Sequence, residues 1–152
     1  MTSRAKFNLH VNDEHRLLVL RPIGAMAGSE IASRTVEFYR SLDAPWTYNR
    51  IVDFRRYDAY VSREDLDFIA AGWADITAGV QYRAYVAMVV REAYEKLRLP
   101  EVSQRFPNET ICYFSDYHEA VGWLQAVDQT RYLANLGALP LRARDGETIT
   151  IQ

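Results

Sequence analysis

The sequence contains one cysteine, three histidines and seven glycines, and each scarcity excludes a class of protein. Cys112 has no second cysteine to pair with, so an internal disulfide and a thiolate-ligated metal cluster are excluded. The glycines do not fall into the spacing of a phosphate-binding loop or a dinucleotide-binding loop. The nearest approach, Gly24 and Gly28 ahead of a predicted helix, is interpreted as a turn and a helix entry.

Long apolar runs and net charge are lacking as well. The longest apolar run, residues 84–90, is far shorter than the roughly 20 residues that a membrane-spanning helix needs. Residues 1–6 lead into no apolar core of a signal peptide, so we expect a cytoplasmic protein without a membrane span. The net charge of −2 supplies no positive field for phosphate backbones, and no nucleic-acid partner is expected.

What the sequence does contain is the composition of a folded domain. Its 152 residues are 49% hydrophobic and 25% charged. A chain of this length buries roughly 70% of its unfolded surface, so it needs no metal or disulfide to be stable. No internal repeat, low-complexity tract or flexible linker divides it. Cys112, within the apolar segment 111–114, is predicted to be a small buried apolar group rather than a reactive thiol.

Hydrophobic periodicity predicts a β-hairpin followed by alternating helices and strands. Residues 7–11 alternate apolar and polar positions, residues 12–15 resemble a turn, and residues 16–23 form a second strand. Further strands are predicted at residues 46–54, 84–90 and 110–114. The fold class is therefore α/β: an N-terminal β-hairpin followed by βαβαβα, with helices packed against a mixed, mostly parallel sheet.

Capping residues mark where the helices of this pattern begin. Ser29 is a predicted N-cap, Ser62 forms a capping pair with Asp65, and Asp116 forms one with Glu119. A further helix is expected from about residue 91, broken near Pro100 and continuing toward residue 106. In the helix after Ser62 the predicted buried stripe is Leu66, Ile69, Ala70, Trp73 and Ile76, and Gly79 is the predicted stop.

The C-terminal stretch is less regular than the rest. Residues 1–126 are predicted to form the α/β domain and residues 127–152 an extension. Within the extension, Asp128 is predicted to cap another helix that ends at Gly137, and Asp145-Gly146 is a hairpin signal. We expect the extension to pack on the domain edge or on a partner subunit, with a frayed tail as the alternative.

Candidate catalytic and metal-binding residues are few. His10 and His15 would meet across the hairpin and bind a metal with Asp13 or Glu14, but a solvated turn is the favoured interpretation. Ser115, Asp116 and His118 resemble a catalytic set, yet neighbours on one helical turn do not reproduce the geometry of a triad. We therefore expect no enzymatic activity, no metal and no cofactor.

The ends of the parallel strands are the favoured place for a binding site, because ligands of open α/β sheets bind there. Polar side chains gather at three such ends, and the candidate ligand-binding residues are Arg55, Arg56, Tyr57, Asp58, Arg91 and Ser115. Arginine offers a planar pair of donors to carboxylate or phosphate, so this rim suits an anion. For these residues, however, a solvated loop with ion pairs such as Arg56 to Asp58 is the favoured interpretation, and the anion-binding rim is the alternative. Four tyrosines that do not fit a buried stripe are predicted to line a pocket or an interface: Tyr48, Tyr57, Tyr60 and Tyr82.

The element order and one local motif resemble a known family. Residues 110–124, TICYFSDYHEAVGWL, are similar to the last strand and following helix of the bacterial SpoIIAA-like group, a branch of the STAS-type domains. The strand at residues 51–54 and Arg83 ahead of residues 84–90 also fit, and the resemblance covers about residues 5–126. It implies a STAS-like fold shared with anti-sigma-factor antagonists and sulfate-transporter tails. Related SEC14-like folds carry lipids.

One departure from the family pattern affects the expected function. In anti-sigma-factor antagonists a phosphorylatable serine follows the strand equivalent to residues 51–54, whereas here Arg55, Arg56 and Tyr57 occupy that turn. The nearest serine, Ser62, is a predicted helix cap. The phosphorylation switch is therefore not carried over.

Two functions from different classes follow from these observations. The leading hypothesis is a non-enzymatic regulatory or binding module with a STAS-like fold, as a homodimer with a regulatory protein partner. The alternative is a protein that binds a small anionic or apolar ligand over Arg55, Arg56 and Arg91.

Overall fold

The computed structural model describes residues 4–137, with side-chain burial for residues 4–127. Its centre is one five-stranded sheet in the order β1-β2-β3-β4-β5. β1 and β2 pair antiparallel as the predicted hairpin, and β2 to β5 run parallel. The strands are β1 (Lys6–Asn12), β2 (Leu17–Ile23), β3 (Asn49–Asp53), β4 (Ala84–Val89) and β5 (Glu109–Phe114).

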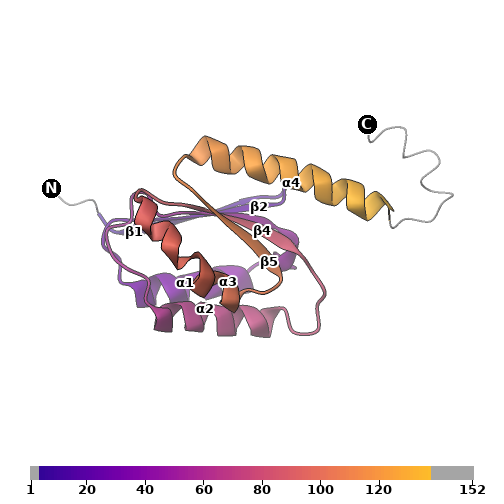
Figure 1. Ribbon diagram of the computed structural model, residues 1–152. Coiled ribbons are helices and arrows are strands. Elements are labelled where there is room, and N and C mark those ends of the chain that lie inside the picture. The colour runs from indigo at the N-terminus through magenta and orange to yellow at the C-terminus, as the bar shows by residue number, and fades with distance from the viewer. Residues whose placement is uncertain (1–3, 138–152) are drawn as a thin grey trace.

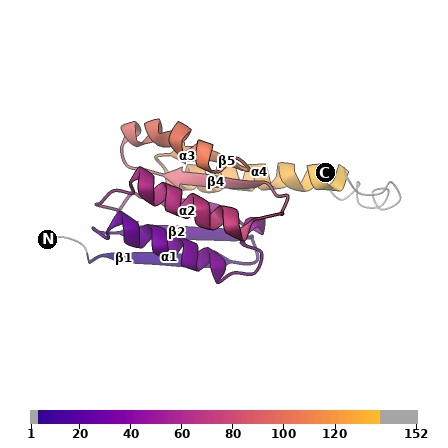
Figure 2. The ribbon, with the colours of Figure 1, turned by 90° about the horizontal axis from the view of Figure 1, so that it is seen from below.

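Helices cover both faces of this sheet, so the molecule has three layers. The α-helices are α1 (Gly28–Arg40), α2 (Arg63–Ile76), α3 (Leu99–Arg105) and α4 (Tyr117–Gly137), with short 3-10 helices η1 (Pro45–Thr47) and η2 (Ala93–Arg98). α1, α2 and α3 lie on one face, and α4 alone lies on the other (Figure 1). Viewed from below, α1, α2 and α3 lie side by side across the sheet (Figure 2).

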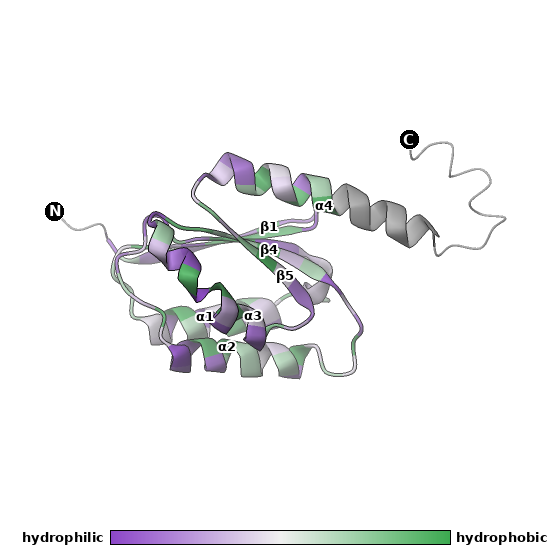
Figure 3. Cartoon of the chain, viewed as in Figure 1, coloured by the Kyte–Doolittle hydropathy of each residue, from purple (hydrophilic) through white to green (hydrophobic). Residues whose placement is uncertain are grey.

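The pleat of the strands divides the core between these two faces. On β3, Arg50 and Val52 share a face with Leu18 and Leu20 of β2, and this face lies under α1 to α3. Ile51 points the other way, into a second cluster with Ala120 and Leu124 of α4. In Figure 3 the helices contain both hydrophobic and hydrophilic residues, as expected of helices that bury one face against the sheet.

Side-chain capping fixes one helix start and backbone packing fixes another. The capping box of α2 is confirmed, since Ser62 Oγ accepts from the backbone N–H of Asp65 and the Asp65 carboxylate accepts from Ser62 N–H. The prediction that Ser29 caps α1 is wrong, because that helix begins at Gly28 without a side-chain cap. A side chain at Gly28 would clash with the backbone of Tyr60, so close packing sets this helix start.

Two segments differ from the predicted pattern because proline begins a helical turn in each. The strand expected at residues 46–54 spans only residues 49–53, preceded by η1 with Pro45 in its first turn. The first part of the helix expected from residue 91 is the 3-10 helix η2. The break predicted near Pro100 falls where η2 gives way to α3, and Pro100 lies in the first turn of α3. Proline suits the first turn, where its missing N–H leaves no bond unmade.

The C-terminal part of the chain also differs from the prediction, because one long helix, α4, crosses the expected domain boundary. It runs without interruption from Tyr117 to Gly137, so Asp128 lies inside a helix and does not cap a new one. The structure describes α4 as far as Gly137, so the prediction that this glycine ends a helix stays a prediction. The hairpin expected around Asp145-Gly146 lies outside the described residues. Within residues 4–137, no helix combines the length and the apolar character needed to cross a membrane.

Candidate ligand-binding cavity

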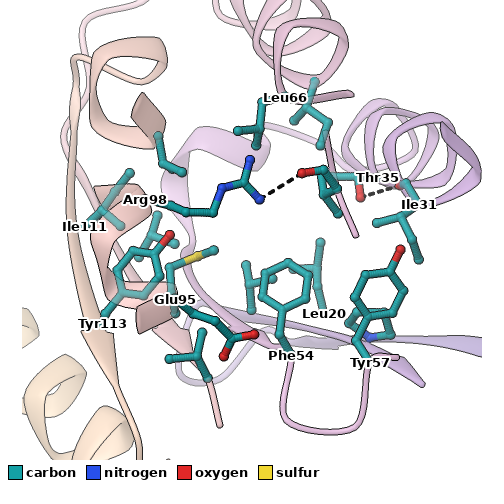
Figure 4. Close-up of a pocket in the computed structure, with 18 of the residues that line it drawn as sticks. Leu20, Ile31, Thr35, Phe54, Tyr57, Leu66, Glu95, Arg98, Ile111 and Tyr113 are labelled. Carbon is teal, nitrogen blue, oxygen red and sulfur yellow. Dashed lines mark hydrogen bonds between the residues drawn. The ribbon is translucent and has the colours of Figure 1, made fainter. Parts of the chain in front are cut away.

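A cavity of about 640 Å³ lies between the sheet and the layer formed by α1, α2 and α3. Its size falls within the roughly 300–1,000 Å³ typical of small-molecule sites. Side chains from opposite sides point toward the same space: Leu20 and Phe54 from the sheet side, Ile31 from α1 and Leu66 from α2 (Figure 4). The cavity therefore lies inside the main core.

The floor of the cavity is apolar because alternate strand residues face it. The residues concerned are Leu20 and Pro22 of β2, Val52 of β3, Val86 and Met88 of β4, and Ile111 and Tyr113 of β5. Each lies on the pleat shared with Arg50, as the strand register shows. The alternation that builds the core thus also builds the lining.

One end of the cavity meets solvent and the other end is closed. The exposed lining residues are at the carboxyl ends of the strands, where Tyr60 is 63% and Tyr94 is 68% exposed. At the opposite end, the side chains of Arg50 and Glu109 are 3% and 2% exposed. From Arg50 to Phe54 the floor extends over four residue steps, roughly 13 Å of extended strand. We call these the mouth and the deep end.

The deep end holds a buried hydrogen-bonded network. Arg50 forms an ion pair with Glu109, whose carboxylate also accepts a 3.0 Å hydrogen bond from the Tyr82 hydroxyl. The indole N–H of Trp73 donates to the same hydroxyl at 2.7 Å. Burial and the nearby Glu109 carboxylate raise the pKa of Tyr82 to about 12. The phenol therefore keeps its proton and serves as a donor to Glu109.

The Arg50 guanidinium is confined between this carboxylate and two aromatic rings. Its central carbon lies 4.5 Å from the centre of a Trp73 ring and 5.3 Å from that of Tyr39. Burial alone would lower the pKa of Arg50, but Glu109 raises it above its ordinary value, so the group stays charged. Its Nε atom is nevertheless buried without a hydrogen-bond partner. A buried donor of this kind is uncommon in folded proteins.

Arg98 is the corresponding arginine nearer the mouth. Its Nε donates to Glu101 at 2.6 Å and its Nη1 donates to the carbonyl of Val61 at 2.8 Å, the bond drawn across the cavity in Figure 4. The guanidinium also lies over the Tyr60 ring, 4.6 Å from its centre. Its Nη2 is buried without a partner. Arg50 and Arg98, which both line the cavity, thus each have one buried nitrogen without a hydrogen-bond partner.

Positive and negative side chains line the cavity in equal numbers. Three are the arginines 50, 91 and 98, and three are the acidic residues Asp58, Glu95 and Glu109. Arg50 pairs with Glu109, and Arg91 lies 3.6 Å from Asp58. Arg98 pairs with Glu101, just outside the lining. The cavity therefore offers hydrogen-bond donors without an excess of positive charge.

The structure brings three of the six predicted site residues to this cavity. Tyr57, Asp58 and Arg91 line its mouth. The Tyr57 hydroxyl donates to the carbonyl of Met26 at 2.7 Å, and Arg91 Nη2 donates to the carbonyl of Tyr57 at 3.1 Å. Asp58 pairs with Arg91 and not with Arg56. Ligand binding by these three residues stays a prediction.

The other three predicted residues do not line the cavity. Arg56 and Ser115 are exposed. Arg55 lies on the α4 side of the sheet, where it and Arg21 both donate to the buried carboxylate of Asp53. Burial would raise the pKa of Asp53, but the hydrogen bonds from Arg55 and Arg21 hold it below its ordinary value. The expected anion-binding rim is thus divided between two faces of the sheet.

The other residues considered for catalysis or metal binding do not form a reactive site in the described structure. Asp116 accepts a 2.7 Å hydrogen bond from the backbone N–H of His118, which caps α4. Burial raises the pKa of the Cys112 thiol, which disfavours the reactive thiolate. Among residues 4–137, no three histidine, cysteine, aspartate or glutamate side chains form a group able to hold a metal ion.

Arg50, Glu109 and Arg98 are not among the site residues predicted from the sequence. A signal for the first existed: Arg50 precedes Val52 and Phe54 by even steps, so strand alternation directs all three to one face. The predicted strand begins at residue 110, one position after Glu109, and Arg98 falls in the helix that is predicted to break near Pro100. Which arginine meets which carboxylate depends on tertiary packing that no local pattern encodes.

Among solved structures, the chain is similar to an uncharacterized protein of the DUF3478 family from Shewanella loihica PV-4, described as having a SpoIIAA-like fold. The two share 15% identity with a TM-score of 0.56, over 82% of this chain and 98% of the other. This similarity concerns the fold, and it confirms the predicted SpoIIAA-like α/β fold. No family model and no curated protein sequence matches the chain.

Proposed function

We propose that the protein is a non-enzymatic binding protein for a small, neutral and largely apolar molecule that occupies the cavity. The observation that carries this proposal is the cavity itself, about 640 Å³ in volume, apolar in its floor and open at the carboxyl ends of the strands. Small-molecule sites have this combination of apolar walls and a few polar groups.

The pairing of charges favours a neutral ligand over an anion. Arg50, Arg91 and Arg98 each already have a carboxylate partner. An anion entering the deep end would lose its water and would meet Glu109 beside Arg50, which is unfavourable in a buried site. The anion expected over Arg55 and Arg56 has weaker support, because these residues lie outside the cavity lining.

Binding without chemical change is supported by the state of the polar groups in the cavity. Glu109 is held by Arg50 and Tyr82, so it is not available as a base. Burial raises the pKa of Tyr113 to about 12, so this phenol keeps its proton at neutral pH. A regulatory role, a homodimer and a cytoplasmic location remain predictions, and ligand occupancy is one way in which a regulatory module would be controlled.

Titration with the neutral dye Nile red tests the proposal. We expect saturable binding of one dye per chain, with the emission of an apolar site. Met88→Trp places a large ring on the cavity floor and should weaken binding by about tenfold or more. Phe68→Ser is the matched control, because Phe68 is 54% exposed on α2 and outside the cavity lining, so its loss should leave binding unchanged.

Solvent extraction of the purified protein followed by mass spectrometry supplies a second measurement. A neutral molecule released in equimolar amount from the wild type, and absent from folded Met88→Trp, supports the proposal. Dye binding that does not saturate, or that Met88→Trp leaves unchanged while Phe68→Ser removes it, would show an exposed apolar surface rather than a cavity and would overturn it.

A further inference from the structure

We propose that η2 is a gate over the mouth of the cavity, closed in this structure by two arginine bridges, and that a ligand enters or leaves only when these bridges part. The bridges are the hydrogen bonds from Arg91 to the Tyr57 carbonyl and from Arg98 to the Val61 carbonyl. This inference rests on the proposed function, because it concerns how the same cavity exchanges its ligand. The mouth then controls how fast the ligand exchanges, whereas the cavity floor controls how tightly it binds.

Each bridge joins η2, or the chain just before it, to the segment that follows β3. Arg91, two residues before η2, donates to the Tyr57 carbonyl at 3.1 Å and lies 3.6 Å from the Asp58 carboxylate. Arg98, the last residue of η2, donates to the Val61 carbonyl at 2.8 Å. Because the two acceptors are four residues apart in the chain, the bridges bound an opening of at most about 14 Å.

Aromatic side chains narrow the opening between the bridges. Tyr60 lies between the two acceptors in the chain, Tyr94 lies between the two arginines, and both line the cavity. The Arg98 guanidinium lies over the Tyr60 ring, 4.6 Å from its centre, so the bridge on this side includes the ring. A ligand with several rings, large enough to fill the cavity, therefore needs η2 to move before it can pass.

The segment of residues 57–61 is anchored to the body of the domain. The Tyr57 side chain is buried, and its hydroxyl donates to the Met26 carbonyl at 2.7 Å. The backbone N–H of Asp58 donates to the Gly24 carbonyl, also at 2.7 Å. These bonds hold the segment against the end of β2, so this side of the mouth stays in place when the gate opens.

η2, on the other side of the mouth, contributes no buried residue to the core. None of its six residues is buried, and Tyr94 and Leu97 are 68% and 79% exposed. Reciprocal hydrogen bonds between Glu92 and Glu95 form a capping box that holds its first turn together. η2 can therefore leave the mouth as a unit without exposing a buried residue of its own. Segments with few buried contacts are those that open most easily, so the two bridges account for most of the cost of opening.

Stopped-flow mixing of Nile red with the full chain tests the gate, because it measures the association and dissociation rate constants separately. Arg98→Met removes one bridge, and both rate constants should rise about tenfold or more, since a hydrogen bond from a charged group is lost. Arg91→Met removes the more exposed bridge, and both should rise roughly threefold. The dissociation constant, which is the ratio of the two, should change much less than either rate constant.

Arg105→Met is the matched control for these two substitutions. Arg105 lies on α3, outside the cavity lining, and its Nε donates to Asp67 of α2 at 2.7 Å. The same change of side chain therefore removes an arginine bridge that does not cross the mouth. It should leave both rate constants for Nile red unchanged.

The outcomes separate the gate from the proposed function. Rate constants that Arg98→Met and Arg91→Met leave unchanged would show that the ligand passes without parting the bridges, and would overturn the gate alone. A rise in the dissociation rate constant only would make the arginine a ligand contact, because losing a contact does not speed entry, and would also overturn it. Should Arg98→Met not fold, Arg91→Met decides by the same criteria, since that side chain is 49% exposed. Absence of saturable Nile red binding by wild type would overturn the proposed function itself.

Discussion

At the scale of single residues, the buried carboxylate of Asp53 shows how a charge is tolerated at the end of a parallel strand. The residue is 2% exposed and accepts hydrogen bonds from two arginines, Arg21 at 3.0 Å and Arg55 at 2.8 Å and 3.0 Å. The backbone N–H of Arg55 adds a fourth bond at 3.1 Å. Hydrogen bonds to a charged acceptor of this kind are among the stronger ones in proteins.

Asp53→Asn should lower the free energy of unfolding by about 1.5–3 kcal/mol near neutral pH, because the amide loses two charge-assisted acceptor positions. The pKa of Asp53 is depressed in the folded state, so its contribution is present above its ordinary pKa and lost as the pH falls through the folded value. Urea unfolding at about pH 7 and about pH 3 checks both statements. The difference between wild type and Asp53→Asn should shrink at the lower pH.

Asp75→Asn is the matched control for this substitution. Asp75 pairs with Arg40 at 3.4 Å and its side chain is 77% exposed, so the loss should stay below about 1 kcal/mol. A pH dependence that is the same in wild type and in Asp53→Asn would mean that Asp53 contributes nothing to acid stability.

Residue-scale reasoning from sequence succeeds where a contact is local and fails where it is not. The capping of α2 by Ser62 joins residues three positions apart, and the pattern alone predicted it. The Arg50–Glu109 pair joins residues 59 positions apart on strands separated by β4. Nothing in either local segment indicates the other, so this part of the candidate site required the tertiary structure.

At the scale of elements, the capping box should contribute measurably to the stability of α2. Ser62→Ala removes the acceptor of the Asp65 N–H and should cost about 1 kcal/mol of unfolding free energy. Ser29→Ala is the control, because Ser29 lies in the first turn of α1 and not at its N-cap, and it should change stability by only a few tenths of a kcal/mol. Equal losses in the two variants, measured by urea unfolding, would contradict the assignment of both helix starts.

The contact between α1 and α2 depends on the absence of a side chain at Gly72. A methyl group there would lie 2.7 Å and 2.8 Å from the two terminal carbons of Val36 on α1. Since real contacts are longer than this, the Val36 side chain or one of the two helices would have to shift. The sequence indicated the stripe of α2 but not this point of closest approach.

Gly72→Ala should therefore destabilise the protein although alanine is the better helix former. Overpacking costs about 1–3 kcal/mol and exceeds the helix gain of about 0.5–1 kcal/mol. Gly122→Ala in α4 is the control, because its added methyl group meets no atom within 4 Å. This substitution should stabilise the protein by the higher helix propensity of alanine alone. Thermal unfolding should give a lower midpoint temperature for Gly72→Ala and a higher one for Gly122→Ala than for wild type. A stabilised Gly72→Ala would show that α1 and α2 can separate without a cost in stability.

At the scale of the whole molecule, the two faces of the sheet are packed differently. The face under α1 to α3 contains the cavity, whereas the face under α4 is filled by a compact cluster around Ile51, Ala87 and Val89. The fold class and the order of the elements along the chain were predictable, because alternation and helical periodicity are properties of short segments. The cavity was not, because its volume depends on how far three helices stand from the sheet.

α4 is longer than the face that it covers. Its 21 residues span roughly 31 Å, whereas a strand of six residues spans roughly 20 Å. Ala120 and Leu124 near its start are buried, and the helix continues past the end of the sheet in both views (Figures 1 and 2). Helices in proteins are stabilised mainly by the packing of one face, so a further contact along this part of α4 would stabilise it.

The predicted homodimer would supply such a contact, and we expect its interface to include the C-terminal half of α4. Light scattering during size-exclusion chromatography at micromolar concentration should give about twice the 17.6 kDa of one chain. Ala134→Pro removes a backbone hydrogen bond within the overhang and should reduce the mass to that of a single chain, since proline inside a helix costs about 3 kcal/mol or more. Gly122→Ala, which strengthens the same helix nearer its start, should remain dimeric. A wild-type mass of 17.6 kDa would exclude the dimer, and a dimeric Ala134→Pro would place its interface elsewhere on the molecule.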